Sequence, residues 1–172
     1  MRVILYCIAL FGSSLLAVAG DFDLQISAQK KTHQGEKSTA GPGGISKAKE
    51  TCAFEITVNN NSSKDTPQLE ARYIVFVLRE QLGEKKGVDP TERVKGSKPI
   101  EPIKAHNKAV IQTDDIALKQ SSLTGGWHYD AGGKINAKDA TKGIWIKIFQ
   151  GDTVVGEYAL PSTIKDKENW DK

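Results

Sequence analysis

The chain has 172 residues and a formal net charge of +3, with 24 Lys and Arg against 21 Asp and Glu. These charges are spread along the sequence without a dense basic cluster, which argues against nucleic acid or an acidic membrane surface as the main partner. Once an N-terminal signal is removed, about 150 residues remain, enough for one domain with its own hydrophobic core.

Residues 1–19 have the three parts of a cleavable secretory signal peptide. Arg2 supplies the positive charge, residues 3–16 are mostly apolar, and residues 17–19 (Ala-Val-Ala) place small side chains before the cleavage point. We expect cleavage after this triplet, with cleavage after Gly20 as the alternative. The apolar run is shorter than the ~20 residues of a bilayer-spanning helix, so we expect no stable membrane insertion. The protein is therefore expected in the periplasm, at the outer cell surface or in the extracellular medium.

The sequence at Gly20 is also similar to the cleavage site of type IV prepilins, which are cut at a Gly followed by Phe or a similar residue. In prepilins the apolar helix follows the cut, because that helix packs into the filament core. Here the apolar segment precedes the cut, and Asp21, Phe22 and Asp23 follow it. The order of the segments argues against a major pilin.

Cys7 leaves with the signal, so Cys52 is the single cysteine of the mature chain. Cys52 lies on the apolar face of an alternating segment, which predicts a small buried side chain. A disulfide bond to a second chain is the alternative.

Alternating apolar and polar residues predict strands along the mature chain. The predicted strands are residues 22–28, 51–59, 69–78, 109–118, 143–150 and 153–160. Residues 69–78 are apolar on both faces, so we expect this strand at the centre of a sheet. The last two strands flank Gly151-Asp152, which suits the tight turn of a β-hairpin. Residues 93–104 contain two prolines, which donate no ladder hydrogen bonds and therefore predict an edge strand or an extended connector.

Two stretches lack this alternation. Residues 32–49 are rich in Gly, Ser and Lys and predict a mobile loop. Residues 119–142 predict a long loop or an extra hairpin, because they contain two Gly-Gly turn signals. About seven strands without a long helix predict an all-β antiparallel sandwich, formed as one domain over residues 20–172.

Catalytic motifs are missing from the sequence. It contains no Gly-x-Ser-x-Gly nucleophile elbow, Walker loop, His-Glu-x-x-His or dinucleotide fingerprint. His33, His106 and His128 lie far apart and lack metal-ligand spacing. Asp114 and Asp115 are adjacent, so in a strand they would point to opposite faces and could not act jointly as acid and base. We expect a non-enzymatic protein without a cofactor or a metal.

The most suggestive local feature is Trp127-His128-Tyr129, which follows a pair of glycines. Aromatic side chains beside Gly and polar groups form stacking platforms for sugars or hot spots for protein partners. The alternative is that Trp127 and Tyr129 plug the end of the sandwich. Trp145 alternates with isoleucines and has the same two interpretations. The candidate contact residues are therefore Trp127, His128, Tyr129 and Trp145.

Four segments carry a resemblance to a known group of proteins: residues 53–60 (AFEITVNN), 73–76 (YIVF), 143–149 (GIWIKIF) and 154–158 (VVGEY). Their strand patterns resemble secreted immunoglobulin-like or fibronectin-III-like proteins of verrucomicrobial bacteria. One such protein is associated with a gene cluster for type IV-like pili. The resemblance covers most of the mature chain, and it implies an immunoglobulin-like sandwich with a role at a pilus or the cell surface.

The signal, the sandwich pattern and the missing catalytic groups predict an exported, non-enzymatic protein that mediates protein contacts at the cell surface. A pilus-associated accessory is one form of that role. Surface or pilus proteins are the expected partners, and edge strands offer a route to homo-oligomers by strand addition. The alternative is a carbohydrate-binding module that uses exposed aromatics, with glycans as its partners.

Overall fold

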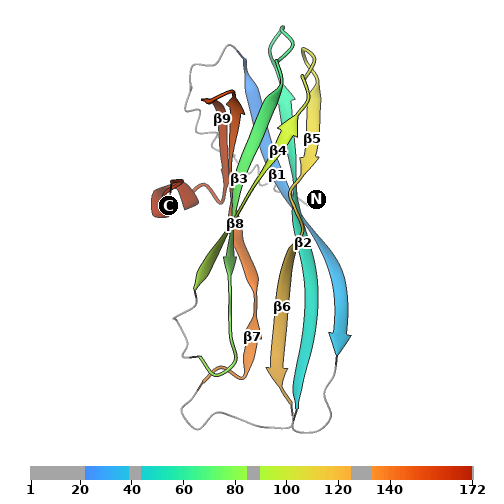
Figure 1. Ribbon diagram of the computed structural model, residues 1–172, viewed down its shortest axis with the longest axis vertical. Helices are drawn as coiled ribbons and strands as arrows, with labels where there is room; N and C mark the ends of the chain where they lie inside the picture. The colour runs from blue at the N-terminus through green and yellow to red at the C-terminus, as the bar shows by residue number, and fades with distance from the viewer. Residues whose placement is uncertain (1–21, 39–43, 85–89, 125–132, 172) are drawn as a thin grey trace, which may run out of the picture.

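The computed structural model describes residues 22–38, 44–84, 90–124 and 133–171. Within these ranges, nine strands form two antiparallel sheets, and one short helix follows the last strand (Figure 1). The molecule is elongated along the strand direction, and the C-terminal helix lies at its side. The predicted all-β antiparallel sandwich is confirmed.

Each sheet draws its strands from several parts of the chain. The first sheet contains β1 (Leu24–Ser38), β2 (Ile45–Asn60), β5 (Lys108–Gln112), β6 (Ile116–Leu123) and β7 (Asn136–Lys138). Its order is β1-β2-β6-β7, with β5 also paired to β2. The second sheet contains β3 (Leu69–Leu78), β4 (Thr91–Ile100), β8 (Ala140–Gln150) and β9 (Thr153–Leu160), and it is followed by α1 (Ile164–Lys167). Its order is β4-β3-β8-β9.

One hydrophobic core fills the space between the sheets. On β2, Cys52, Ile56 and Val58 are 0% exposed and Phe54 is 3% exposed. These side chains form one cluster with alternate residues of β3 and β8. The alternation predicted for residues 51–59 is confirmed, because every second side chain faces the opposite sheet.

Cys52 is buried in this core, as predicted. Burial raises the pKa of its thiol, because the thiolate would lose its hydration. Its zero exposure also leaves no route for a disulfide bond to a second chain without opening β2.

β3 occupies the central position predicted for residues 69–78, because it pairs with both β4 and β8. Tyr73, Val75 and Val77 belong to the core between the sheets. Ile74 and Phe76 point to the outer side of the four-stranded sheet, where a second apolar cluster buries them. Cover on both sides explains why this strand is apolar on both faces.

Prolines and glycines lie where their backbone chemistry allows. β4 pairs only with β3 among the described strands, so Pro99 sits on an edge strand, as predicted. The β8–β9 hairpin closes at the Gln150–Thr153 pair, around the predicted Gly151-Asp152 turn. Gly151 has φ 58°, a left-handed conformation that Gly adopts without a steric penalty.

The prediction of one continuous strand over residues 109–118 is wrong, because residues 113–115 separate β5 from β6. Both strands pair with β2, and residues 113–115 face only residues 53–54 of β2. The Thr113 N–H donates to the Phe54 carbonyl at 2.9 Å, and the Phe54 N–H donates to Thr113 Oγ1 at 2.8 Å. These bonds satisfy the backbone at the irregularity.

The prediction of a mobile loop over residues 32–49 is also wrong. β1 continues to Ser38 and β2 begins at Ile45, with His33 opposite Thr51 and Ser38 opposite Lys47. Ladder hydrogen bonds on both sides of β2 hold this segment, so a Gly- and Lys-rich composition does not prevent pairing. Residues 39–43 lie outside the described residues.

Residues 119–142, predicted as a long loop or an extra hairpin, contain paired strands. β6 runs to Leu123, and β7 returns antiparallel to it, with Gln120 opposite Lys138. This pairing corresponds to the extra hairpin. Residues 125–132 lie outside the described residues.

The far part of the five-stranded sheet extends beyond the core. We call residues 33–38, 45–51 and 119–123 the distal ribbon. None of its described side chains is buried, whereas the continuation of β2 enters the core at Cys52. The distal ribbon is therefore held by backbone pairing more than by apolar packing.

Candidate functional site

Of the four candidate contact residues, Trp127, His128 and Tyr129 lie outside the described residues, and Trp145 lies on β8. Trp145 points to the outer side of the four-stranded sheet, as alternation along the strand requires. Its side chain is nevertheless only 6% exposed. Trp145 is therefore not an exposed aromatic in this conformation.

The C-terminal segment covers Trp145. Ile164 of α1 and Trp170 pack against Ile74, Phe76 and Trp145 in the second apolar cluster. The rings of Trp145 and Trp170 meet edge to face, with centroids 5.3 Å apart. This packing holds the C-terminal segment against the outer side of the four-stranded sheet.

The polar groups around Trp145 are also partnered. Its indole N–H donates to Glu157 Oε1 on β9 at 2.8 Å. Lys147 Nζ lies 5.4 Å from the centroid of the Trp145 ring and 4.7 Å from that of Trp170. A buried indole with a satisfied N–H has a structural role, because it contributes packing without an unpaired donor.

Cations also lie over rings elsewhere on this outer side. The guanidinium carbon of Arg72 is 4.2 Å from the centroid of Phe149, and that of Arg93 is 5.5 Å from the centroid of Phe76. Contacts of this kind contribute about 0.5–1 kcal/mol each at exposed sites. They hold long cationic side chains in fixed places on the sheet.

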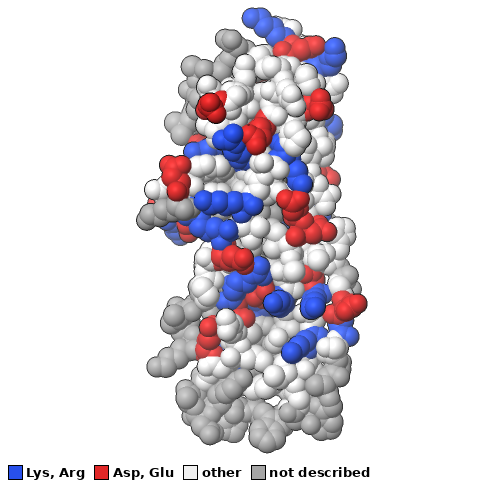
Figure 2. All heavy atoms as spheres, in the orientation of Figure 1, with Lys and Arg blue, Asp and Glu red and all other residues white. Residues whose placement is uncertain are grey.

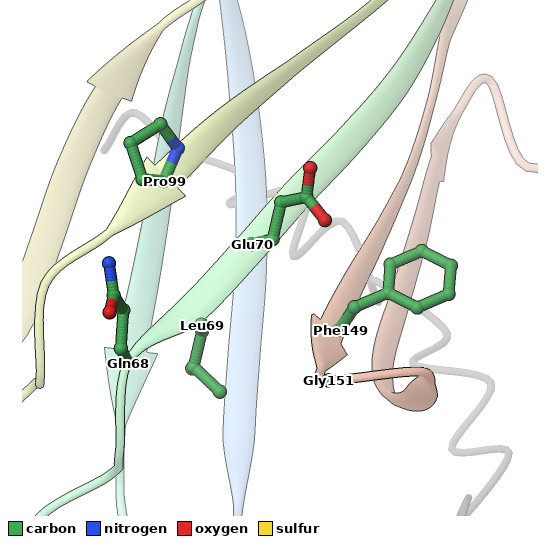
Figure 3. A pocket seen from close by; sticks show the side chains of 6 residues that line it. All are labelled: Gln68, Leu69, Glu70, Pro99, Phe149 and Gly151. Carbon is green, nitrogen blue, oxygen red and sulfur yellow. The ribbon is translucent and has the colours of Figure 1, made fainter.

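A groove runs beside the Arg72–Phe149 contact at one end of the four-stranded sheet (Figure 3). It has a volume of about 340 Å³ and is lined by Gln68, Leu69, Glu70, Pro99, Phe149 and Gly151. In Figure 3, Pro99 of β4 and Phe149 of β8 lie on either side of Glu70. The groove is therefore open to solvent between an edge strand and the β8–β9 turn.

A second groove of about 340 Å³ shares Glu70 with the first, and Arg72, Lys95 and Trp170 also line it. Arg72 Nε donates to Glu70 Oε2 at 2.8 Å, and this bond lowers the pKa of the Glu70 carboxyl group. Their side chains are 43% and 37% exposed, respectively. An exposed ion pair stacked on Phe149 thus lies between two grooves.

Tyr73 links the two sheets near the second groove. Its hydroxyl donates to Asp114 Oδ2 at 3.0 Å and accepts from the Asp114 N–H at 3.1 Å. Lys98 pairs with the same carboxylate, and the bonds from Lys98 and Tyr73 lower the pKa of Asp114. Burial raises the pKa of Tyr73. Asp114 therefore has a structural role, because Tyr73 and Lys98 hold its carboxylate.

A cleft of about 690 Å³ lies between the end of β3 and the strands β2, β6 and β7. Asp139 is 4% exposed at the point where the chain passes from β7 into β8. Its Oδ2 accepts from Arg79 Nη1 at 2.7 Å and from the Lys119 N–H at 3.0 Å. Arg79 also pairs with Glu92, so this charge cluster joins the two sheets.

Among the described residues, no group of three or more His, Cys, Asp or Glu side chains is placed to hold a metal ion. Lys and Arg side chains lie beside Asp and Glu over the face drawn in Figure 2. No described helix has the length and hydropathy needed to cross a bilayer.

Sequence reasoning missed Glu70, Arg72, Phe149 and Trp170. Arg72 and Phe149 occupy outward positions in strands that the sequence did predict, so their face could be inferred. Their contact across β3 and β8 depends on register, which no short-range pattern in the sequence specifies. Trp170 lies in a polar tail whose seat on the sheet only the fold reveals.

No protein-family model and no curated protein matches the sequence. A target of the Northeast Structural Genomics Consortium aligns over 78% of this chain and 84% of its own, with 8% identity and a TM-score of 0.37. A protein from Akkermansia muciniphila, a verrucomicrobial bacterium, aligns over 81% and 70%, with 7% identity and a TM-score of 0.35. A Bordetella pertussis protein provisionally named ApaA aligns over 80% and 92%, with 9% identity and a TM-score of 0.32. Similarity at this level carries no argument about function.

Proposed function

We propose that this protein is an exported, non-enzymatic module that binds another protein at the cell surface through the outer side of its four-stranded sheet. The carrying observation is the exposed Glu70–Arg72 pair, stacked on Phe149 and flanked by two grooves. Arginine and aromatic side chains dominate the energetics of protein interfaces. The cation–aromatic contact orders Arg72 in advance, which reduces the entropy lost on binding.

One feature of the sequence and one of the fold support this proposal. The N-terminal residues 1–19 have the pattern of a secretory signal, which favours export. The order β4-β3-β8-β9 opposite β1-β2-β6 is consistent with the immunoglobulin-like arrangement that the resemblance implies. Pilus and other surface proteins are the proposed partners, and a mature N-terminus at residue 20 or 21, found by mass spectrometry of envelope protein, tests the export step.

The binding face is tested by cross-linking mass spectrometry in the envelope of the source organism. The wild-type protein is expected to cross-link to a defined surface protein, with links concentrated on β3, β4 and β8. Arg72→Ala is expected to reduce these links about tenfold, since truncating an interface hot spot commonly costs one to two factors of ten in affinity.

Lys104→Ala is the matched control, because Lys104 also forms an exposed ion pair, with Asp65 at 3.2 Å, but lies outside both grooves. Thermal unfolding of both variants checks that they remain folded. The proposal fails if the wild type links to no surface protein, or if the two variants lose links equally.

The carbohydrate-binding alternative now depends on Trp127 and Tyr129, because Trp145 is covered. A stacking platform binds neutral sugars and changes Trp fluorescence. A glycan array on which the wild type binds neutral glycans, with loss on Trp127→Ala, would favour this alternative over protein contacts.

A further inference from the structure

Three large apolar side chains form one cluster on the outer side of the four-stranded sheet: Ile74, Phe76 and Trp145. Ile74 on β3 lies directly opposite Trp145 on β8, and Phe76 lies two residues from Ile74 on the same face of β3. We call these three residues the outer strip. The outer side of an antiparallel sandwich is normally polar, so an apolar strip on this side requires a cover.

The C-terminal segment, residues 161–171, supplies that cover. Its Ile164 and Trp170 pack against the outer strip, whose side chains are at most 6% exposed. Among the described residues, Ala159 on β9 is the one other apolar residue packed into this cluster. Displacement of the C-terminal segment would therefore expose the outer strip.

The packing beneath the C-terminal segment is incomplete. Ile164 is the one buried side chain in residues 161–171, and Trp170 is partly exposed. A cavity of about 150 Å³ is lined by Ile164 together with Phe76 of the outer strip. α1 is a single turn of four residues without a side-chain cap hydrogen bond. A segment with so few buried apolar contacts opens locally at a low free energy.

Polar contacts between the C-terminal segment and the sheet lie at the surface. The Arg93 guanidinium donates to the Asn169 carbonyl, at an exposed position. Lys165 pairs with Glu157 at 3.4 Å, and their side chains are 30% and 21% exposed. Because water competes for groups at the surface, these contacts orient the segment but add little to its stability.

The outer strip adjoins the proposed binding face. Trp145 and Phe149 are four residues apart on the same face of β8, and Arg72 stacks on Phe149. Trp170 also lines the second groove, together with Arg72 and Lys95. The position of the C-terminal segment therefore determines the shape of this groove, and release of the segment would join the outer strip to the exposed Arg72.

We propose that the C-terminal segment is a displaceable cover, and that a segment of the partner protein replaces it on the outer strip. This inference rests on the proposed function, because it places the partner on the same side of the sheet. The replacing segment carries an aliphatic and an aromatic side chain in the places of Ile164 and Trp170, and a backbone carbonyl that accepts from Arg93. The apparent affinity for the partner then depends on the fraction of molecules in which the cover is open.

The first test uses a labelled synthetic peptide with the sequence of residues 162–171 as the probe. Its binding to the full-length mature protein is measured by fluorescence anisotropy. The wild type should bind the peptide weakly, because its own C-terminal segment competes at a high effective concentration. Ile164→Ser/Trp170→Ala removes both apolar contacts of the cover and keeps the outer strip, so this variant should bind the peptide about tenfold more tightly or better.

The matched control is Val110→Ser/Ile135→Ala, which alters two apolar side chains, 51% and 43% exposed, outside the outer strip. It should bind the peptide like the wild type, and circular dichroism checks the fold of every variant. Trp170→Ala alone, which keeps the buried Ile164, replaces the double variant if the latter does not fold. The proposal is overturned if the variant without these cover contacts binds the peptide no more tightly than the wild type, or if the control gains as much.

Native-state hydrogen exchange tests the cover without a substitution. The Glu168 N–H donates to the Ile164 carbonyl at 2.9 Å. It should exchange at least about a hundredfold faster than the ladder N–H groups at the centre of β3 and β8, because the segment opens locally. Equal protection would show that the segment opens only with the whole fold, and this result would overturn the proposal.

Cross-linking mass spectrometry in the envelope separates this inference from the proposed function. Ile164→Ser/Trp170→Ala should form several-fold more links to the surface protein than the wild type does. If the wild type forms such links and the variant forms no more, the cover is wrong and the proposed function stands. If neither protein forms links, the proposed function is wrong, and the peptide and exchange measurements still decide whether the segment is displaceable.

Discussion

The two parts of β2 place similar residues in opposite environments. Ile56, in the part that crosses the sandwich, is 0% exposed, whereas Ile45, in the distal ribbon, is 39% exposed. Both residues belong to a strand with neighbours on both sides, β1 on one and β5 or β6 on the other. Backbone pairing is therefore common to the two parts, and apolar burial distinguishes them.

This difference separates core packing from surface charge along a single strand. In the sandwich, side chains are committed to the core, where each buried Ile contributes about 1.5–3 kcal/mol. In the distal ribbon, side chains carry little of the core energy and can be selected for charge. Lys49 and Lys119 lie opposite each other in this second part, where the ladder fixes their spacing.

The largest expected effect comes from the packed part. Ile146 on β8 is 0% exposed within the core. Ile146→Ala should lower the free energy of unfolding by about 3 kcal/mol, because it removes apolar contacts and leaves a cavity. Denaturant unfolding gives this value directly.

Ile45→Ala is the matched substitution in the distal ribbon. It should cost less than about 1 kcal/mol, because Ile45 is 39% exposed and little cavity forms. Equal losses in the two variants would show that the distal ribbon contributes to the core as much as the sandwich does.

A smaller effect is expected at the junction of the two sheets. Asp139→Asn should lower the free energy of unfolding by about 2 kcal/mol, because it leaves Arg79 without its most buried partner. Loss of one partner of a fully buried pair costs ~3–5 kcal/mol, and the 27% exposure of Arg79 reduces that figure. Glu92→Gln, which alters the 50% exposed partner of the same Arg79, should cost less. Denaturant unfolding of the two variants decides which substitution costs more. If both unfold with the same dependence on denaturant concentration, the variant with the lower midpoint is the less stable.

The sequence predicted those elements whose signal is local. The alternation from Cys52 to Val58 and the Gly151-Asp152 turn each specify a strand or a hairpin within a few residues. Burial on both faces of residues 69–78 likewise indicated a central strand. These features determine the sandwich, because they identify which strands must be covered.

Elements held by non-local pairing could not be predicted in the same way. Residues 32–49 look like a loop because they are rich in Gly, Ser and Lys. Residues 32–38 nevertheless pair with β2, and residues 45–49 pair with β6. The grooves beside Arg72 and the opposition of Lys49 and Lys119 are products of register between distant segments. Of the predicted contact residues, Trp145 is buried, which is one of the two interpretations that the sequence left open.

The smallest expected effect is the sharpest test of the division between the two parts of β2. Lys119→Glu places a carboxylate directly opposite Lys49. Replacing a like-charge pair with an opposite-charge pair across a sheet should raise the free energy of unfolding by about 0.5 kcal/mol. Lys119→Gln, which removes the repulsion without adding attraction, should lie between Lys119→Glu and the wild type. Denaturant unfolding of the three proteins measures this order. If the free energy of unfolding falls on Lys119→Glu, the two lysines stabilise the distal ribbon, and the charge on this part of β2 contributes to folding.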